Sequence, residues 1–207
     1  ASHAQSQLTN DIKSGTNSEL LIEELADVNQ AATTVAKRSE GLMQFVQSYR
    51  SLTAMPEPKL MTVKVGELFI SIEKLLSTTW HNEGVKLSIE LPSQQLEIQA
   101  DADLIEQVLL NLLQNAQQAL IEHNVNKPQV LLSCAMHQRG YVMIEVADNG
   151  PGISDGIINE IFVPFFTTKK QGTGVGLALS RQIMLAHGGS ITAGKSSMGG
   201  AKFVLIF

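Results

Sequence analysis

The feature that most limits the fold is a long apolar repeat that ends at two prolines. Apolar residues recur at intervals of four and three from Leu21 to Tyr49, with one polar interruption at Ser39. This spacing predicts one long helix with an apolar stripe sustained over about four heptads. Pro56 and Pro58 then end the helix, because proline cannot continue it. A single helix cannot bury its stripe alone, so we expect a dimeric helical bundle. The alternative is packing on the rest of the same chain.

Beyond the prolines, short segments of strand and helix periodicity follow one another to the C-terminus. The pattern predicts strands over 60–65, 85–91, 96–100, 129–137, 141–147, 190–193 and 201–207, and helices over 67–79, 102–123, 157–161 and 175–187. Strands and helices do not alternate regularly, which favours an α+β fold built as a two-layer α/β sandwich. The chain is therefore predicted to comprise a helical part over 1–55, a linker over 56–59 and a compact domain over 60–207.

Composition excludes several classes of protein. The 15 basic and 20 acidic residues give a net charge of −5, and no basic run is present, which argues against a nucleic-acid binder. The single cysteine, Cys134, excludes an intrachain disulfide framework and a multi-cysteine metal site. The apolar runs are far too short to span a bilayer. We therefore expect a soluble, cytoplasmic chain.

A row of neutral amides is the first candidate for chemistry. Gln107, Asn111 and Asn115 are four residues apart, so they share one face of the helix predicted over 102–123. Amide oxygens are among the hard oxygen ligands that suit Mg²⁺, which also keeps waters and phosphate oxygens. On this row alone, a solvated helix edge is the simpler interpretation.

A second candidate is the run Asp-Asn-Gly-Pro-Gly-Ile at 148–153, directly after a predicted strand. A carboxylate at Asp148 would accept a charge-assisted hydrogen bond from an amino group. Adenine offers such a group where guanine presents a carbonyl, so the contact would discriminate between them. A hairpin turn is the alternative, although Gly150 and Gly152 with the intervening proline exceed what a turn needs.

A third candidate is the run Gly-Thr-Gly-Val-Gly-Leu at 172–177, which leads into a helix. Free backbone N–H groups at a helix start, approached closely because of the glycines, bind anions. A flexible loop is the alternative interpretation. Just upstream, Thr167, Thr168 and Lys169 follow a phenylalanine-rich stretch and could reach phosphates from a lid with few apolar anchors.

Taken together, in this order and spacing, the segments resemble the ATP-binding domain of sensor histidine kinases. That family belongs to a wider group with gyrase, the large heat-shock chaperone and mismatch-repair ATPases. The resemblance covers about 60–207, with an asparagine box at 107–119, a first glycine box at 148–153, a phenylalanine box at 162–169 and a second glycine box at 172–180. The helix over 19–52 is similar to the second helix of the dimerisation and phosphoacceptor domain, in a form related to nitrogen-regulation sensors.

The resemblance implies an open pocket for ATP and Mg²⁺ under a flexible lid. Asp148 would bind the adenine amino group, Asn115 would hold Mg²⁺, and Asn111 would border the metal and phosphates. One departure is Gln118, where many members carry Lys or Arg, with Lys169 or Lys170 as candidates to compensate. The nucleotide-binding residues implied are Asn111, Asn115, Gln118, Asp148, Gly150, Gly152, Ile153, Phe166, Thr167, Thr168, Lys169, Gly172, Thr173, Gly174, Val175, Gly176 and Leu177.

The resemblance also implies a protein-histidine kinase of a two-component signalling system. Its parent would move the γ-phosphoryl group of ATP to a His and then to an Asp of a response regulator, and would form a homodimer through the N-terminal helices. Anchoring of the parent in the inner membrane is left open. The family's phosphoacceptor is a His followed at once by an acidic residue, and none of the five histidines here fits, since His3, for example, precedes Ala4.

We therefore expect a fragment that begins just past the phosphorylated His, binds Mg-nucleotide and does not autophosphorylate, and we assign no catalytic residue to it. The alternative is a nucleotide-holding regulatory or dimerisation module without kinase activity. A gyrase-type ATPase is disfavoured, because those members carry a water-activating Glu where this chain has Asn111.

Overall fold

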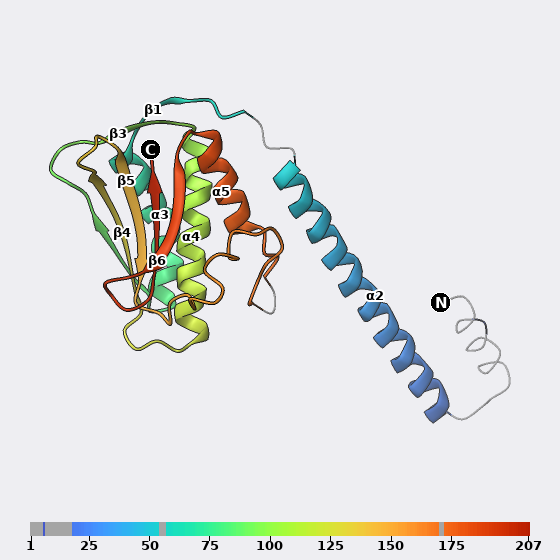
Figure 1. The fold of residues 1–207 in the computed structure, drawn as a ribbon. Helices are drawn as coiled ribbons and strands as arrows, with labels where there is room; N and C mark the ends of the chain where they lie inside the picture. Colours follow the sequence, from blue (N-terminus) through green and yellow to red (C-terminus); the bar gives the residue numbers. More distant parts are fainter. Residues whose placement is uncertain (1–5, 7–17, 54–56, 170–171) are drawn as a thin grey trace. The chain divides into compact units, whose positions relative to one another are not determined.

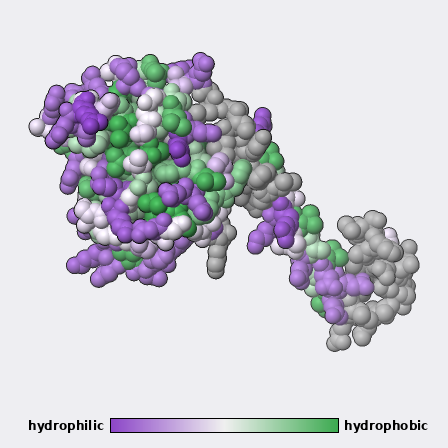
Figure 2. Space-filling model, in the orientation of Figure 1, coloured by the Kyte–Doolittle hydropathy of each residue, from purple (hydrophilic) through white to green (hydrophobic). Residues whose placement is uncertain are grey.

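The computed structural model describes residues 6, 18–53, 57–169 and 172–207. The chain forms two compact units, Ala1–Arg50 and Ser51–Phe207. Helix α2 (Ser18–Thr53) accounts for nearly all the described part of the first unit, which confirms the predicted long helix (Figure 1). Figure 2 shows apolar and polar residues interspersed along α2, and Leu25, Val35 and Met43 are each more than half exposed. The predicted domain boundaries and the dimer stay predictions.

The second unit is built on a five-stranded sheet in the order β2-β4-β5-β7-β6. Its strands are β2 (Lys86–Glu90), β4 (Gln129–Met136), β5 (Val142–Asp148), β6 (Ser190–Lys195) and β7 (Ala201–Ile206). The pair β2–β4 is parallel and the other pairs are antiparallel. A separate antiparallel pair joins β1 (Met61–Lys64) to β3 (Glu97–Ala100). The mixed sheet agrees with the predicted α+β class.

The helices described beside this sheet are α3 (Val65–Asn82), α4 (Ala102–Glu122) and α5 (Gly176–Ala186). Figure 1 shows α4 and α5 side by side against the sheet. Leu109, Leu112 and Leu113 of α4 are fully buried, and so is Leu132 of the facing sheet. The apolar stripe of α4 therefore holds this helix in place, while its polar edge stays available for a site.

One predicted element is wrong. The segment 157–161 was expected to be helical, but it forms consecutive turns. The N–H groups of Ile157 and Glu160 donate to the third residue back, Ser154 and Ile157, and only that of Ile161 donates to the fourth, Ile157, so the described segment does not continue as an α-helix. Ile157 and Ile161 line cavity walls, so tertiary packing sets the conformation here. The other predicted helices and strands are confirmed, with small shifts at their ends.

Candidate functional site

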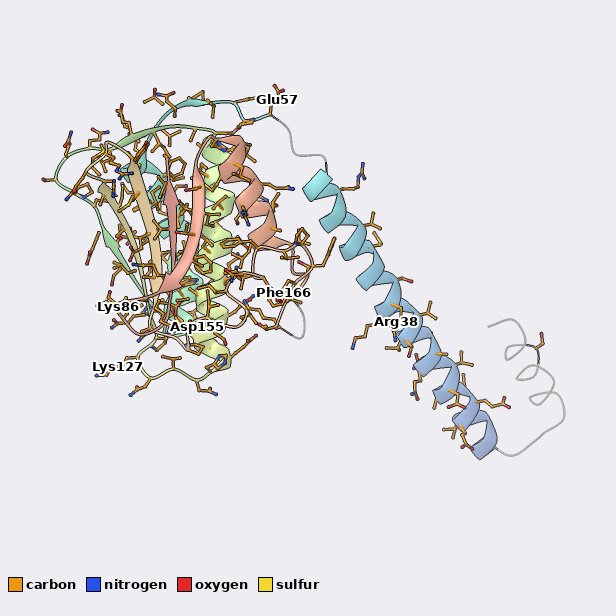
Figure 3. The ribbon with its side chains drawn as sticks, viewed as in Figure 1. Arg38, Glu57, Lys86, Lys127, Asp155 and Phe166 are labelled. Carbon is orange, nitrogen blue, oxygen red and sulfur yellow. The ribbon has the colours of Figure 1, made fainter. Side chains whose placement is uncertain are left out.

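The candidate site consists of two adjoining cavities between α4 and the long segment that connects β5 to α5. Their volumes are about 320 and 810 Å³. Six residues line both: Asn115, Ile157, Ile161, Thr168, Lys169 and Leu177. Figure 3 shows Phe166, which lines the smaller cavity, and Asp155, which lines the larger one, on this connecting segment. The shared walls make the two cavities one elongated site.

Asp148 is a buried carboxylate in the wall of the larger cavity. It is the last residue of β5, and its side chain is held by two backbone N–H groups. Oδ1 accepts from Gly150 (2.8 Å) and from Ala201 (3.1 Å), and neither bond uses Oδ2. Burial raises the pKa of the Asp148 carboxyl, and these two hydrogen bonds oppose the rise. The arrangement leaves one carboxylate oxygen to accept from an amino group.

Glycines pack closely behind this carboxylate. A Cβ added at Gly200 would collide with Oδ1 of Asp148 and would lie 2.5 Å from its carbonyl oxygen. Gly152 has a φ of +77°, a conformation that side-chain-bearing residues rarely adopt. Gly200 was not predicted as a site residue, because it contacts Asp148 only through the fold and no local pattern around 199–200 marks it.

Asn111 lies in the wall of the smaller cavity, where its orientation is fixed by α5. Its Nδ2 donates to Oγ of Ser180 (3.0 Å), and that hydroxyl donates to the carbonyl of Gly176 (2.9 Å). A Cβ at Gly176 would collide with the Asn111 amide. An amide cannot serve as a general base, so Asn111 cannot activate water. This agrees with the expectation that the chain is not a gyrase-type ATPase. Ser180, which is 1% exposed, belongs to the second glycine box but was not predicted to orient Asn111.

Asn115 and Gln118 present two amide oxygens to one cation. Nζ of Lys169 donates to Oδ1 of Asn115 (3.0 Å) and to Oε1 of Gln118 (2.7 Å). Burial lowers the pKa of Lys169, and the charge of Glu122 opposes the change. Because the ammonium group is itself a cation on amide oxygens, this donor set fits a hard cation such as Mg²⁺.

Short-range hydrogen bonds hold the segment over the smaller cavity, which is described at residues 165–169 and 172–174. The N–H of Lys169 donates to Oγ1 of Thr167 (3.1 Å), and the N–H of Gly172 donates to the carbonyl of Lys169 (3.2 Å). The N–H of Phe165 donates to the carbonyl of Gly174 (2.8 Å). Gly174 has a φ of +67°, and a Cβ there would meet the Phe165 carbonyl, so this position requires glycine.

The structure brings most of the predicted residues together. Those that line the smaller cavity are Asn111, Asn115, Gln118, Phe166, Thr167, Thr168, Lys169, Gly172, Thr173, Gly174, Gly176 and Leu177. Those found in the larger cavity but not in the smaller one are Asp148, Gly152 and Ile153. Gly150 and Val175 line neither cavity: Gly150 holds Asp148, and Val175 is buried before α5. Lys170 lies outside the described residues.

Several lining residues were not predicted, namely Gln114, Glu122, His123, Asp155, Ile157, Ile161 and Lys195. The four-residue spacing of Ile153, Ile157 and Ile161 could have indicated an apolar wall. Among the described residues, no group of three or more His, Cys, Asp or Glu side chains could hold a metal ion. None of the described helices is long and apolar enough to cross a membrane.

Known proteins resemble this chain in sequence and in fold. The family described as histidine kinase-, DNA gyrase B-, and HSP90-like ATPase matches residues 100–207. The chain is similar to the sensor histidine kinase ZraS of Escherichia coli (strain K12), with 34% identity over 180 residues. That alignment covers 86% of this chain and 37% of ZraS, so the chain spans under two-fifths of the length of this relative.

Solved structures share the fold. The catalytic domain of histidine kinase ThkA, in a nucleotide-free form, has a TM-score of 0.62 and 30% identity over 72% of this chain and 95% of that one. Full-length ShkA in complex with AMPPNP has a TM-score of 0.68 and 26% identity, covering 86% of this chain and 38% of ShkA. ThkA in complex with the response regulator protein TrrA has a TM-score of 0.62 and 22% identity, covering 93% of this chain and 51% of that one.

Proposed function

The chain belongs to the family of histidine kinase-, DNA gyrase B- and HSP90-like ATPases, and on that premise we propose that it is the ATP-binding catalytic region of a sensor histidine kinase. One observation carries the proposal. A single elongated site joins the buried carboxylate of Asp148 at one end to the amides of α4 and the glycine-rich loop before α5 at the other. An adenine nucleotide has the matching order of groups, with an amino group at one end and phosphates at the other.

Each end of the site has a proposed role. Oδ2 of Asp148 accepts from the adenine amino group, because Oδ1 is already engaged by two backbone N–H groups. The backbone of Gly172–Gly176 approaches the phosphates at the start of α5, where N–H groups favour anions. Asn115 holds Mg²⁺ through Oδ1, and the bound metal ion would neutralise phosphate charge.

The parent protein, in this proposal, moves the γ-phosphoryl group of ATP to a His and then to an Asp of a response regulator. Positioning and charge neutralisation would supply most of the catalysis. ThkA, a structural relative, was solved with a response regulator protein, which supports a receiver domain as the partner. None of the five histidines of this chain precedes an acidic residue, so we expect no autophosphorylation by the chain itself.

A calorimetric titration tests the proposal. The chain is titrated with ADP and with a non-hydrolysable ATP analogue, with and without Mg²⁺, beside Asp148→Ala and the control Asp103→Ala. Asp103 lies on the first turn of α4, outside both cavities. We expect magnesium-enhanced binding that Asp148→Ala abolishes and Asp103→Ala leaves unchanged. No binding by the wild-type chain would refute the proposal.

Transfer is tested separately, by adding a segment that carries a His–acidic pair on a helix and measuring phosphoryl transfer from ATP to it. Phosphorylation of the added segment supports a kinase region. The second candidate, a nucleotide-holding module without kinase activity, is favoured by the neutral Gln118, because many members place a cation there. Nucleotide binding without any transfer would support this second candidate.

We also propose that the chain forms a homodimer through α2. Leu25 and Val35 belong to the apolar repeat and are 56% and 65% exposed, so these two positions of the stripe are uncovered. Sedimentation should show a dimer that the double variant Leu25→Glu, Val35→Glu converts to a monomer. Gln30→Glu, on the same helix outside the repeat, serves as the control. A wild-type monomer at all concentrations would contradict the proposal.

A further inference from the structure

Lys169 lies at the boundary between the two cavities. Its side chain lines both of them, and its ammonium group is hydrogen-bonded to Asn115 and Gln118 on α4. A ligand that extends from Asp148 in the larger cavity to the glycine-rich loop in the smaller one has to pass this point. The bridge from Lys169 to α4 therefore lies where the proposed nucleotide would pass from one cavity to the other.

The ammonium group also occupies the atom proposed for the metal. Oδ1 of Asn115 accepts from Nζ of Lys169 at 3.0 Å. A metal ion and the Lys169 ammonium group, both bound to Oδ1 of Asn115, would repel each other strongly, because a partly buried site screens charge poorly. Metal binding and the lysine bridge are therefore expected to exclude one another at Asn115.

The bridge is well suited to exchange. The amide oxygens of Asn115 and Gln118 are neutral, and the charge of Glu122 acts on Lys169 without a direct hydrogen bond in the described structure. Lys169 is half-buried, so its ammonium group loses part of its hydration in this position. Neutral acceptors compensate an ammonium group less than a carboxylate would, so the bridge can be displaced.

The same bridge fastens the segment over the cavity to α4. The carbonyl of Lys169 accepts from the N–H of Gly172, and the N–H of Lys169 donates to Oγ1 of Thr167. Of the residues that the structure describes in the smaller cavity wall, Lys169 alone carries a positive charge. Loss of that charge should release the segment and remove the competitor for the metal in one step.

We propose that Lys169 is an internal cation that holds Asn115 and Gln118 in the empty site, closes the passage between the two cavities, and is exchanged for Mg²⁺ when Mg-nucleotide binds. This inference rests on the proposed nucleotide-binding function. It differs from a simple phosphate contact, which would strengthen nucleotide binding equally with and without the metal.

The test is the magnesium enhancement, defined as the ratio of the ADP dissociation constants without and with saturating Mg²⁺. Calorimetry gives this ratio for the wild-type chain, for Lys169→Met and for the control Lys86→Met, which removes one exposed charge from edge strand β2 (Figure 3). Exchange predicts a ratio about tenfold larger in Lys169→Met, since the metal no longer displaces a charged hydrogen-bond donor. Lys86→Met should match the wild-type chain.

A double variant shows how much of the effect of Lys169 on the magnesium enhancement depends on its hydrogen bond to Gln118. Gln118→Ala should raise the ratio by less than Lys169→Met does, and adding it to Lys169→Met should raise the ratio no further, since both act through one bridge. Hydrogen exchange of the Phe165 and Gly172 amides in the nucleotide-free chain gives a second readout. These amides should exchange about tenfold faster in Lys169→Met, because the segment is no longer fastened to α4.

The outcomes separate the two proposals. An unchanged or smaller ratio in Lys169→Met, with normal binding by the wild-type chain, overturns the exchange and leaves the proposed function standing. Unchanged hydrogen exchange overturns the closure of the passage. A wild-type chain that binds no nucleotide overturns the proposed function and the exchange with it.

Discussion

The backbone N–H of Ala201 donates to Oδ1 of Asp148 at 3.1 Å, joining residues 53 positions apart in the sequence. The bond ties the end of β5 to the start of β7, and with the second bond from Gly150 it fixes the plane of a buried carboxylate. A carboxylate that is 4% exposed and has no cationic hydrogen-bond partner among the described residues is costly for the fold. Such a residue is better explained by what it binds than by what it stabilises.

The first prediction concerns Asp148→Asn and the free energy of unfolding. The pKa of Asp148 is raised in the folded chain above its ordinary value of 3.8. Its charge therefore destabilises the fold above the folded pKa, and this penalty disappears below pH 3.8. Asn keeps an oxygen for both backbone bonds and carries no charge. At pH 7 the free energy of unfolding of the variant should equal or exceed that of the wild-type chain, although the variant binds ADP more weakly.

Denaturant unfolding at pH 7 and near pH 4 checks whether the charge of Asp148 destabilises the fold. The difference between Asp148→Asn and the wild-type chain should shrink as the pH falls, since the wild-type carboxyl then becomes neutral. A variant clearly less stable than the wild-type chain at pH 7 would show that the carboxylate supports the fold.

The second prediction concerns Gly200→Ala. Its methyl group would collide with the Asp148 side chain and crowd the Gly150 N–H at 2.5 Å, so the carboxylate must move. Overpacking of this kind costs about 1–3 kcal/mol in the free energy of unfolding. We expect that loss together with weaker ADP binding.

Gly194→Ala is the matched control, because a Cβ there meets nothing within 4 Å. It lies on β6 and should change neither stability nor affinity by much. Calorimetry and thermal unfolding of both variants measure the two effects. Normal ADP binding by Gly200→Ala would show that the position of Asp148 does not govern the site.

The third prediction concerns Asp101 and the pH dependence of stability. The N–H of Lys59 donates to Oδ2 of Asp101 (2.9 Å), and the N–H of Leu104 donates to Oδ1 (3.3 Å). The bond from Lys59 is the main cause of a lowered pKa of Asp101. The carboxylate therefore stabilises the fold above pH 3.8, and this stabilisation disappears as the pH falls through the folded pKa.

Asp101→Asn removes the charge and keeps a good helix N-cap. The free energy of unfolding of the variant should be lower than that of the wild-type chain at pH 7, and the two should converge as the pH falls through the folded pKa of Asp101. Asp103→Asn, in the same helical turn but without the cap bond, should show a smaller effect at pH 7. A pH-independent difference for Asp101→Asn would contradict the assignment.

Local pattern was enough to predict most of the second unit. The helix predicted over 102–123 follows from a short-range pattern, and it is confirmed as α4. The glycine runs and Asp148 could be identified because their chemistry is concentrated in a few consecutive residues. The predicted helix over 157–161 was wrong, because packing of its isoleucines into the cavity walls outweighs local propensity.

The remaining site residues depend on contacts that only the fold creates. Ser180 orients Asn111 across 69 positions, and Gly200 supports Asp148 from the turn that joins β6 to β7, far from Asp148 in the sequence. The bridge from Lys169 to Gln118 spans 51 positions. The family resemblance gave Lys169 or Lys170 as candidates to compensate for the neutral Gln118, but it did not indicate that Lys169 and Gln118 would bond to each other.

The central claim is that Asp148 selects adenine, and the most direct test compares ADP with inosine diphosphate, which carries a carbonyl in place of the amino group. We predict that the wild-type chain with Mg²⁺ binds ADP about ten- to a hundredfold more tightly, the range expected when a charge-assisted hydrogen bond is lost. Asp148→Asn should lose that preference. Equal affinity of the wild-type chain for the two nucleotides would contradict the account.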